Sequence, residues 1–173
     1  YQYMADNSIS LEMAARKLRY DWFEKVRVEF NAAKIAVGHH KDDSIETFLI
    51  NLTRGSGIKG LTGISPQNGY IIRPLLCLFR EEALNYLTLK GISYVNDSTN
   101  NEDAYTRNKI RLNIIPELQK INPSIKQSIS HTLKYLSSAE KIYSWSIQQM
   151  AKEVFDGKKL NISKLKEFPE PQT

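Results

Sequence analysis

The sequence has 173 residues, of which 41% are hydrophobic and 25% are charged, proportions typical of a globular protein rather than a disordered or fibrous chain. No apolar run approaches the ~20 residues that a membrane span requires. A single cysteine, Cys77, excludes a disulfide framework and an all-cysteine metal site. The formal charge is +5, yet residues 1–104 contain 12 Lys and Arg against 13 Asp and Glu, whereas residues 105–173 contain 12 against 6. The basic part is therefore a candidate surface for a polyanion, with solubility as the alternative explanation.

Helical and strand patterns alternate along residues 1–104. Apolar residues recur every three or four positions over 11–30, which predicts a helix with Trp22 in the core. A β-branched run at 34–38 predicts a buried strand, and helical periodicity resumes from 42 to 52. A turn is expected at 65–69, an extended segment at 70–75, a helix at 80–90 and another strand at 92–95. The alternation predicts an α/β fold with a parallel sheet.

A polar segment at 97–103 predicts a boundary between residues 1–104 and 105–173. Beyond it, apolar residues recur at helical spacing over 110–120 and again from 125 to 154, and residues 160–162 are a strand candidate. We therefore expect an α/β part followed by a small all-helical domain.

The densest cluster of functional groups lies between the strand at 34–38 and the helix that follows it. Its members are His39, His40, Asp42, Asp43, Glu46 and Thr47. Ligands bind at the carboxyl ends of strands in open α/β sheets, so this position favours an active site over an acidic helix cap with solvated histidines. Three chemistries stay open: a divalent metal held by His and Asp, Mg²⁺ held by carboxylates on a nucleoside triphosphate with His stabilising the transferring group, and a general base at His39.

A glycine-rich segment follows this helix, starting with Arg54, Gly55 and Gly57. Backbone amides of glycines can approach an anion closely, although Gly55 is equally well explained as an ordinary helix end. The segment matches neither the phosphate loop of Walker proteins nor the dinucleotide fingerprint. It is a weak candidate for an anion site.

Two arginine pairs are further candidates for binding anions. Arg107 and Arg111 lie four positions apart and share one helix face, which gives a fork suited to phosphate or carboxylate. Arg16 and Arg19 form a similar pair on the first helix. The alternative for each pair is that its arginines are ordinary surface residues that face solvent and bind no ligand.

Seven blocks of sequence, taken in order, carry a family resemblance. They are ARKLRY at 15–20, GHHKDDSIETFL at 38–49, RGSGIKGL at 54–61, RPLL at 73–76, DSTN at 97–100, YTRNKIR at 105–111 and IPEL at 115–118. Together they resemble the tRNA(Ile)-lysidine synthetases, members of the N-type ATP pyrophosphatase (PP-loop) superfamily. Each block is moderately specific and the ordered set is highly specific. The match extends over about two thirds of the chain.

The resemblance implies a partial Rossmann-like parallel sheet of the PP-loop ATPase type and an ATP-dependent modification of tRNA. Such enzymes adenylate the C2 oxygen of the wobble cytidine in an isoleucine tRNA with a CAU anticodon. Free L-lysine then displaces AMP through its ε-amino group. The implied cofactors are ATP and Mg²⁺, the implied location is the cytoplasm without a membrane, and a homodimer is compatible with the family.

The resemblance also implies roles for individual residues. His39 and Asp43 match positions that act in adenylation. His40, Asp42, Glu46 and Thr47 complete the nucleotide-associated motif, with Mg²⁺ on ATP at Asp42 and Asp43 and no tight structural metal. The positions expected to bind tRNA, lysine or phosphate are Arg19, Arg54, Gly55, Gly57, Arg107 and Arg111.

One departure from the family is the absence of its phosphate loop, Ser-Gly-Gly-x-Asp-Ser. We therefore expect this chain to be the middle of such an enzyme and to form no lysidine alone. A sister PP-loop tRNA thiolase is the nearest competing function, although Cys77 alone cannot relay sulfur or hold an iron–sulfur cluster. A metal-dependent phosphohydrolase and a non-catalytic helical RNA-binding module are compatible with the acidic cluster and with the basic residues 105–173, respectively.

Overall fold

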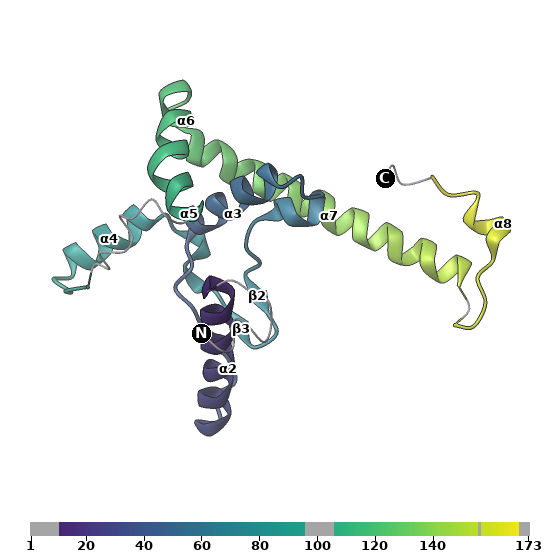
Figure 1. The fold of residues 1–173 in the computed structure, drawn as a ribbon, viewed down its shortest axis with the longest axis horizontal. Helices are drawn as coiled ribbons and strands as arrows, with labels where there is room; N and C mark the ends of the chain where they lie inside the picture. The colour runs from purple at the N-terminus through teal and green to yellow at the C-terminus, as the bar shows by residue number, and fades with distance from the viewer. Residues whose placement is uncertain (1–10, 96–105, 156, 170–173) are drawn as a thin grey trace. The chain divides into compact units, whose positions relative to one another are not determined.

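The computed structural model describes residues 11–95, 106–155 and 157–169, and most of them are helical (Figure 1). The chain forms two compact units, one of Tyr1–Lys41 with Ser65–Leu89 and one of Asp42–Ile64 with Lys90–Thr173. The predicted boundary segment 97–103 lies outside the described residues. The two units are each built from separate stretches of the chain, so they do not test a domain boundary at residue 104, which stays a prediction. Within the described ranges, no helix has both the length and the hydropathy of a membrane span.

The first unit contains a small three-stranded sheet with helices before and after its strands. Its elements are α2 (Leu11–Glu29), β1 (Ile35–Ala36), β2 (Gln67–Asn68), β3 (Ile71–Ile72), the 3₁₀ helix η2 (Pro74–Cys77) and α4 (Arg80–Leu89). The strand order is β1-β3-β2. β1 and β3 run parallel, with Ala36 paired with Ile72. This confirms a strand within the predicted range 34–38. Of the extended segment predicted at 70–75, only Ile71 and Ile72 form a strand, because η2 begins at Pro74.

The sheet is mixed, and the prediction of a parallel sheet is wrong for β2. β2 pairs antiparallel with β3, so that Asn68 faces Ile71. Only two residues, Gly69 and Tyr70, connect the strands, and such a short connection allows only a hairpin. Gly69 has a φ of +57°, which suits the first position of a tight hairpin turn.

Two further predictions for this part of the chain are wrong. Trp22 is 59% exposed rather than in the core, whereas Ala14 of α2 is buried. Helical periodicity identifies an apolar face, but it does not reveal what covers that face. Residues 92–95 form no regular secondary structure. Their β-branched and aromatic side chains favour a strand only where a neighbouring strand can pair with them.

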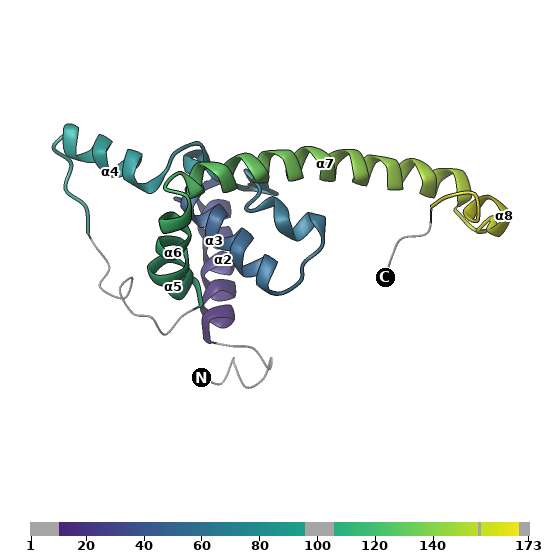
Figure 2. The same cartoon turned by 90° about the horizontal axis from the view of Figure 1, so that it is seen from above.

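The second unit is helical. It contains α3 (Lys41–Thr53) from Asp42 onward, the 3₁₀ helix η1 (Ile58–Thr62), α5 (Thr106–Lys109), the π-helical turn η4 (Ile110–Ile114), α6 (Ile115–Ile121), α7 (Ile125–Val154) and α8 (Ile162–Leu165). α7 is one unbroken helix of 30 residues (Figure 2) that packs against η1 and α6. The strand predicted at 160–162 is wrong. Leu160 forms only an isolated bridge with Phe155, and Ile162 begins α8.

The buried residues of the second unit confirm the predicted helical periodicity. Its buried apolar residues lie at helical spacings on α3, η4, α6 and α7: Ile45, Leu49, Ile110, Ile115, Ile129, Leu133 and Val154. Gly63 follows η1 with a φ of +76°, and a β-carbon on it would lie 3.2 Å from Leu133 Cδ2 and 3.3 Å from Ser44 Cβ. The close approach of η1 to α7 therefore depends on glycine at this position.

Candidate functional site

The predicted cluster at residues 39–47 is divided between the two units. His39 and His40 belong to the first unit, at the residues that follow β1. Asp42, Asp43 and Glu46 belong to the second unit, on the first turns of α3. The division thus falls directly after Lys41, the first residue of α3.

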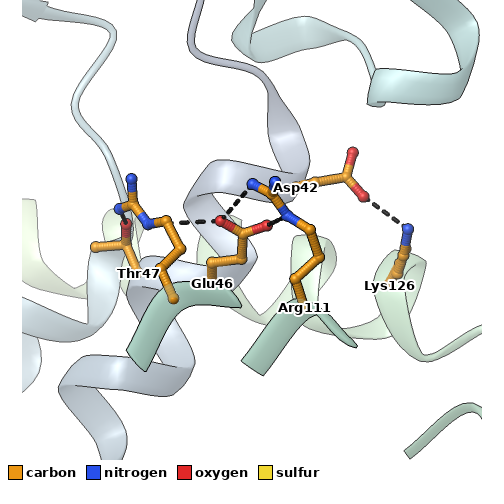
Figure 3. A network of polar contacts seen from close by, with 6 residues as sticks. Asp42, Glu46, Thr47, Arg111 and Lys126 are labelled. Atoms are coloured by element: carbon orange, nitrogen blue, oxygen red, sulfur yellow. Dashed lines mark hydrogen bonds and ion pairs between the residues drawn. The ribbon is translucent and has the colours of Figure 1, made fainter. Parts of the chain in front are cut away.

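Glu46 is the centre of a polar network in the second unit (Figure 3). Its side chain is completely buried. Arg111 donates to both carboxylate oxygens, from Nε at 2.7 Å and from Nη2 at 3.1 Å. Arg107 Nε lies 3.5 Å from Glu46 Oε2, and Arg107 Nη2 donates to Thr47 Oγ1 at 3.1 Å. The predicted arginine fork therefore holds a carboxylate from within the protein.

Burial and ion pairing act in opposite directions on Glu46. Burial raises the pKa of the Glu46 carboxyl above its ordinary value of 4.5, while the hydrogen bonds and charge of Arg111 oppose that rise. The same hydrogen bonds raise the pKa of Arg111, which keeps its guanidinium charged. The nearby charge of Asp43 adds to the rise for Glu46.

Asp42 forms an ion pair with a lysine from another helix. Lys126, near the start of α7, donates from Nζ to Asp42 Oδ1 at 2.7 Å. Asp42 and Asp43 are both buried. Sequence analysis missed Lys126, because it lies 84 positions away from Asp42 and nothing in its local pattern distinguishes it from a surface lysine. Among the described residues, the site thus combines the carboxylates of α3 with cations from η4, α5 and α7.

Mg²⁺ bound by protein side chains does not fit the residues as they lie. One carboxylate oxygen of Asp42 accepts a hydrogen bond from the Lys126 ammonium, and the Glu46 carboxylate accepts hydrogen bonds from Arg111. In the described part of the chain, no group of three His, Cys, Asp or Glu side chains is placed to hold a metal ion. Mg²⁺ carried by ATP needs only one or two carboxylates beside the phosphates, so its place at Asp42 and Asp43 stays a prediction, and the proposed chemistry includes no step through it.

The first unit places a buried arginine against His39. Arg73 Nε donates to His39 Nδ1 at 3.1 Å, and Arg73 Nη1 donates to the carbonyl oxygen of Ser65 at 2.7 Å. His40 is half-buried. Arg73 belongs to the RPLL block, so its position was visible in the sequence, but nothing local indicated its histidine partner 34 positions away.

The remaining candidates lie outside these contacts. Arg54 is exposed just after α3, and among the described residues no contact joins it to the Glu46 network. Gly55 has a φ of +70°, the conformation of an ordinary helix end, and Gly57 precedes η1. Arg19 is exposed on α2. Within the second unit, the structure therefore assembles Glu46, Thr47, Arg107 and Arg111, and no hydrogen bond or ion pair of the described residues joins Arg54 to them.

Comparisons with known proteins show the family of the chain. A family model described as the PP-loop domain matches residues 2–118. A tRNA(Ile)-lysidine synthase from Parabacteroides distasonis is 49% identical over 99% of this chain and 39% of its own length. Another from Bacteroides thetaiotaomicron is 51% identical over 99% of this chain and 40% of its own length. The chain thus spans about 40% of the length of these curated relatives.

One solved structure has a similar fold. It is the U34-tRNA thiolase NcsA from Methanococcus maripaludis with its 4Fe–4S cluster, with a TM-score of 0.57 over 74% of this chain and 44% of that one. At 20% identity, this similarity shows the fold alone. The α/β expectation is therefore supported at the level of the PP-loop fold.

Proposed function

We propose, on the premise that the chain belongs to the PP-loop domain family, that it is part of an ATP-dependent enzyme that ligates lysine to the wobble cytidine of an isoleucine tRNA. Support comes from relatives named tRNA(Ile)-lysidine synthase, which are 49% and 51% identical over 99% of the chain. The family accounts for the use of ATP. The names of the relatives support tRNA(Ile) as the substrate.

The proposed reaction has two steps. The C2 oxygen of the cytidine attacks the α-phosphorus of ATP, the bond from that phosphorus to the bridging oxygen breaks, and pyrophosphate leaves. The ε-amino nitrogen of lysine then attacks C2, the bond from C2 to the oxygen breaks, and AMP leaves with that oxygen. The nitrogen releases its proton to solvent.

The structural observation that carries the proposal is the buried contact of Glu46 with Arg107 and Arg111. Residues 65 positions apart meet there through two hydrogen bonds. Removing charges from water costs several kcal/mol per ion unless their partners compensate, so ionic clusters of this kind are concentrated at functional sites.

We assign His39 and Asp43 to the adenylation step, as the family resemblance implies. The resemblance also associates His40, Asp42, Glu46 and Thr47 with the nucleotide. L-lysine and the tRNA with a CAU anticodon would be the substrates. A homodimer, a cytoplasmic location and tRNA contacts of Arg19 and Arg54 stay predictions.

Lysine incorporation tests this function directly. The full-length protein that contains this chain is incubated with ATP, radiolabelled lysine and a tRNA(Ile) transcript with a CAU anticodon. We expect label in the tRNA and one AMP released per lysine incorporated. Asp43→Asn should lower the rate by about 100-fold, since a charged group acting on the transition state contributes on this scale. Glu81→Gln, a change at an exposed residue of α4, is the matched control and should keep the rate.

Three results would contradict the proposal. A full-length protein that incorporates no lysine, or that modifies a transcript with U34 equally well, would exclude the lysidine reaction. Transfer of sulfur to tRNA would favour the thiolase, whose fold is similar. The 173-residue chain alone should incorporate no lysine.

A further inference from the structure

Arg73 and His39 lie at corresponding ends of two neighbouring parallel strands. β1 pairs with β3 through Ala36 and Ile72, so the residues that follow both strands emerge at the same edge of the sheet. The backbone N–H of Arg73 donates to the carbonyl of Pro66 at 2.9 Å, which fixes the position of the arginine. The proposed function uses His39 but gives Arg73 no role.

The guanidinium of Arg73 is buried without a carboxylate partner in the described part of the chain. The residue is 8% exposed, and its side-chain hydrogen bonds go to two neutral acceptors, His39 Nδ1 and the Ser65 carbonyl. A buried cation is expensive unless it is paired with an anion. Packing alone therefore does not account for arginine here, because an apolar side chain of similar length would avoid this cost.

The direction of the hydrogen bond determines where the His39 proton lies. Arginine has five N–H donors and no acceptor, so His39 Nδ1 must accept in the 3.1 Å contact from Arg73 Nε. An imidazolium has no acceptor nitrogen, and a neutral imidazole has only one. The contact therefore requires a neutral His39 whose proton is on Nε2.

We infer that Arg73 is a positioning residue, which orients His39 and holds it in the tautomer that carries its proton on Nε2. This inference rests on the proposed function for its chemical consequence. The sequence left three roles open for a histidine at this site: a metal ligand, a general base, and a group that stabilises the transferring group. Because Nε2–H is a hydrogen-bond donor, His39 in this tautomer would donate a hydrogen bond to an anionic oxygen of the phosphoryl group rather than accept a proton.

The first test is the tautomer itself. The full-length protein is labelled with ¹⁵N-histidine, long-range ¹H–¹⁵N spectra are recorded, and the His39 signals are identified by their loss in His39→Gln. We expect protonated Nε2 and bare Nδ1 in the unsubstituted protein. A proton on Nδ1 of that protein would overturn the inference, and this measurement needs no variant at Arg73.

The second test compares two substitutions of Arg73. Arg73→Met removes the donor with similar side-chain length, and it should give a mixture of tautomers. It should also lower kcat for lysidine formation by about 10- to 100-fold, the usual effect of losing a group that orients a histidine, with KM within about twofold. Arg73→Lys keeps a cationic donor and should restore most of the tautomer and of kcat. Lys25→Met, a change at an exposed residue of α2, is the matched control.

The outcomes separate this inference from the proposed function. An Arg73→Met protein with an unchanged His39 tautomer, or with an altered KM and unchanged kcat, would overturn the positioning role. If the unsubstituted protein forms no lysidine but shows an Arg73-dependent tautomer, the proposed function fails and the positioning role stands. If Arg73→Met does not fold, the spectrum of the unsubstituted protein decides.

Discussion

Replacing Arg111 with methionine tests whether burial determines the strength of the Glu46 network. The change removes the two hydrogen bonds at 2.7 and 3.1 Å and leaves Arg107, at 3.5 Å, as the remaining cation on a carboxylate without exposed surface. Breaking a fully buried pair in this way costs ~3–5 kcal/mol. Because the Arg111 side chain is 27% exposed and Arg107 stays in place, we expect a loss of about 2–3 kcal/mol of unfolding free energy.

An exposed ion pair in the same unit provides the matched control. Lys120 Nζ lies 2.6 Å from Glu117 Oε1, a distance like that in the buried pair, but the two side chains are 71% and 67% exposed. Lys120→Met should therefore cost less than about 1 kcal/mol. The assay is urea unfolding of the full-length protein at pH 7, with the slope against urea concentration checked for constancy. Equal losses for Arg111→Met and Lys120→Met would refute the reasoning.

Three further predictions concern pH, a second ion pair and a glycine. The pKa of the Glu46 carboxyl is raised in the folded protein, so protonation of Glu46 favours folding. This stabilisation is complete when the pH is below 4.5, the ordinary pKa of the group, and is lost as pH rises through the folded-state pKa. The difference in unfolding free energy between the unsubstituted protein and Glu46→Gln should fall accordingly as pH rises from below 4.5, and a difference that does not change with pH would contradict the shift. Lys126→Met leaves its buried carboxylate partner without that cation and should cost ~1–2 kcal/mol in urea unfolding, against less than ~0.5 kcal/mol for the exposed Lys134→Met on the same helix. Gly63→Ala combines a positive φ with close side-chain neighbours, so its melting temperature should fall further than that of Gly69→Ala, where the φ is also positive but the space is open. Equal shifts would show that packing adds nothing at Gly63.

The sequence predicted those features of the site that depend on local spacing. Arg107 and Arg111 share a face because they lie four residues apart, and this placement follows from helix geometry alone. Their fork was expected to hold a phosphate or a carboxylate, and the structure supplies a carboxylate, Glu46. The identity of that partner was not predictable, since helical spacing fixes a face and not the group opposite it.

Periodicity determined the helices and most of the buried apolar stripe, because a helix repeats every 3.6 residues whatever surrounds it. Only the tertiary structure decided that Lys126 meets Asp42, that Arg73 meets His39 and that Trp22 stays exposed. Each of these depends on segments brought together from distant positions in the chain. The local sequence specifies which side chains can form such contacts, and the folded chain specifies which of them do.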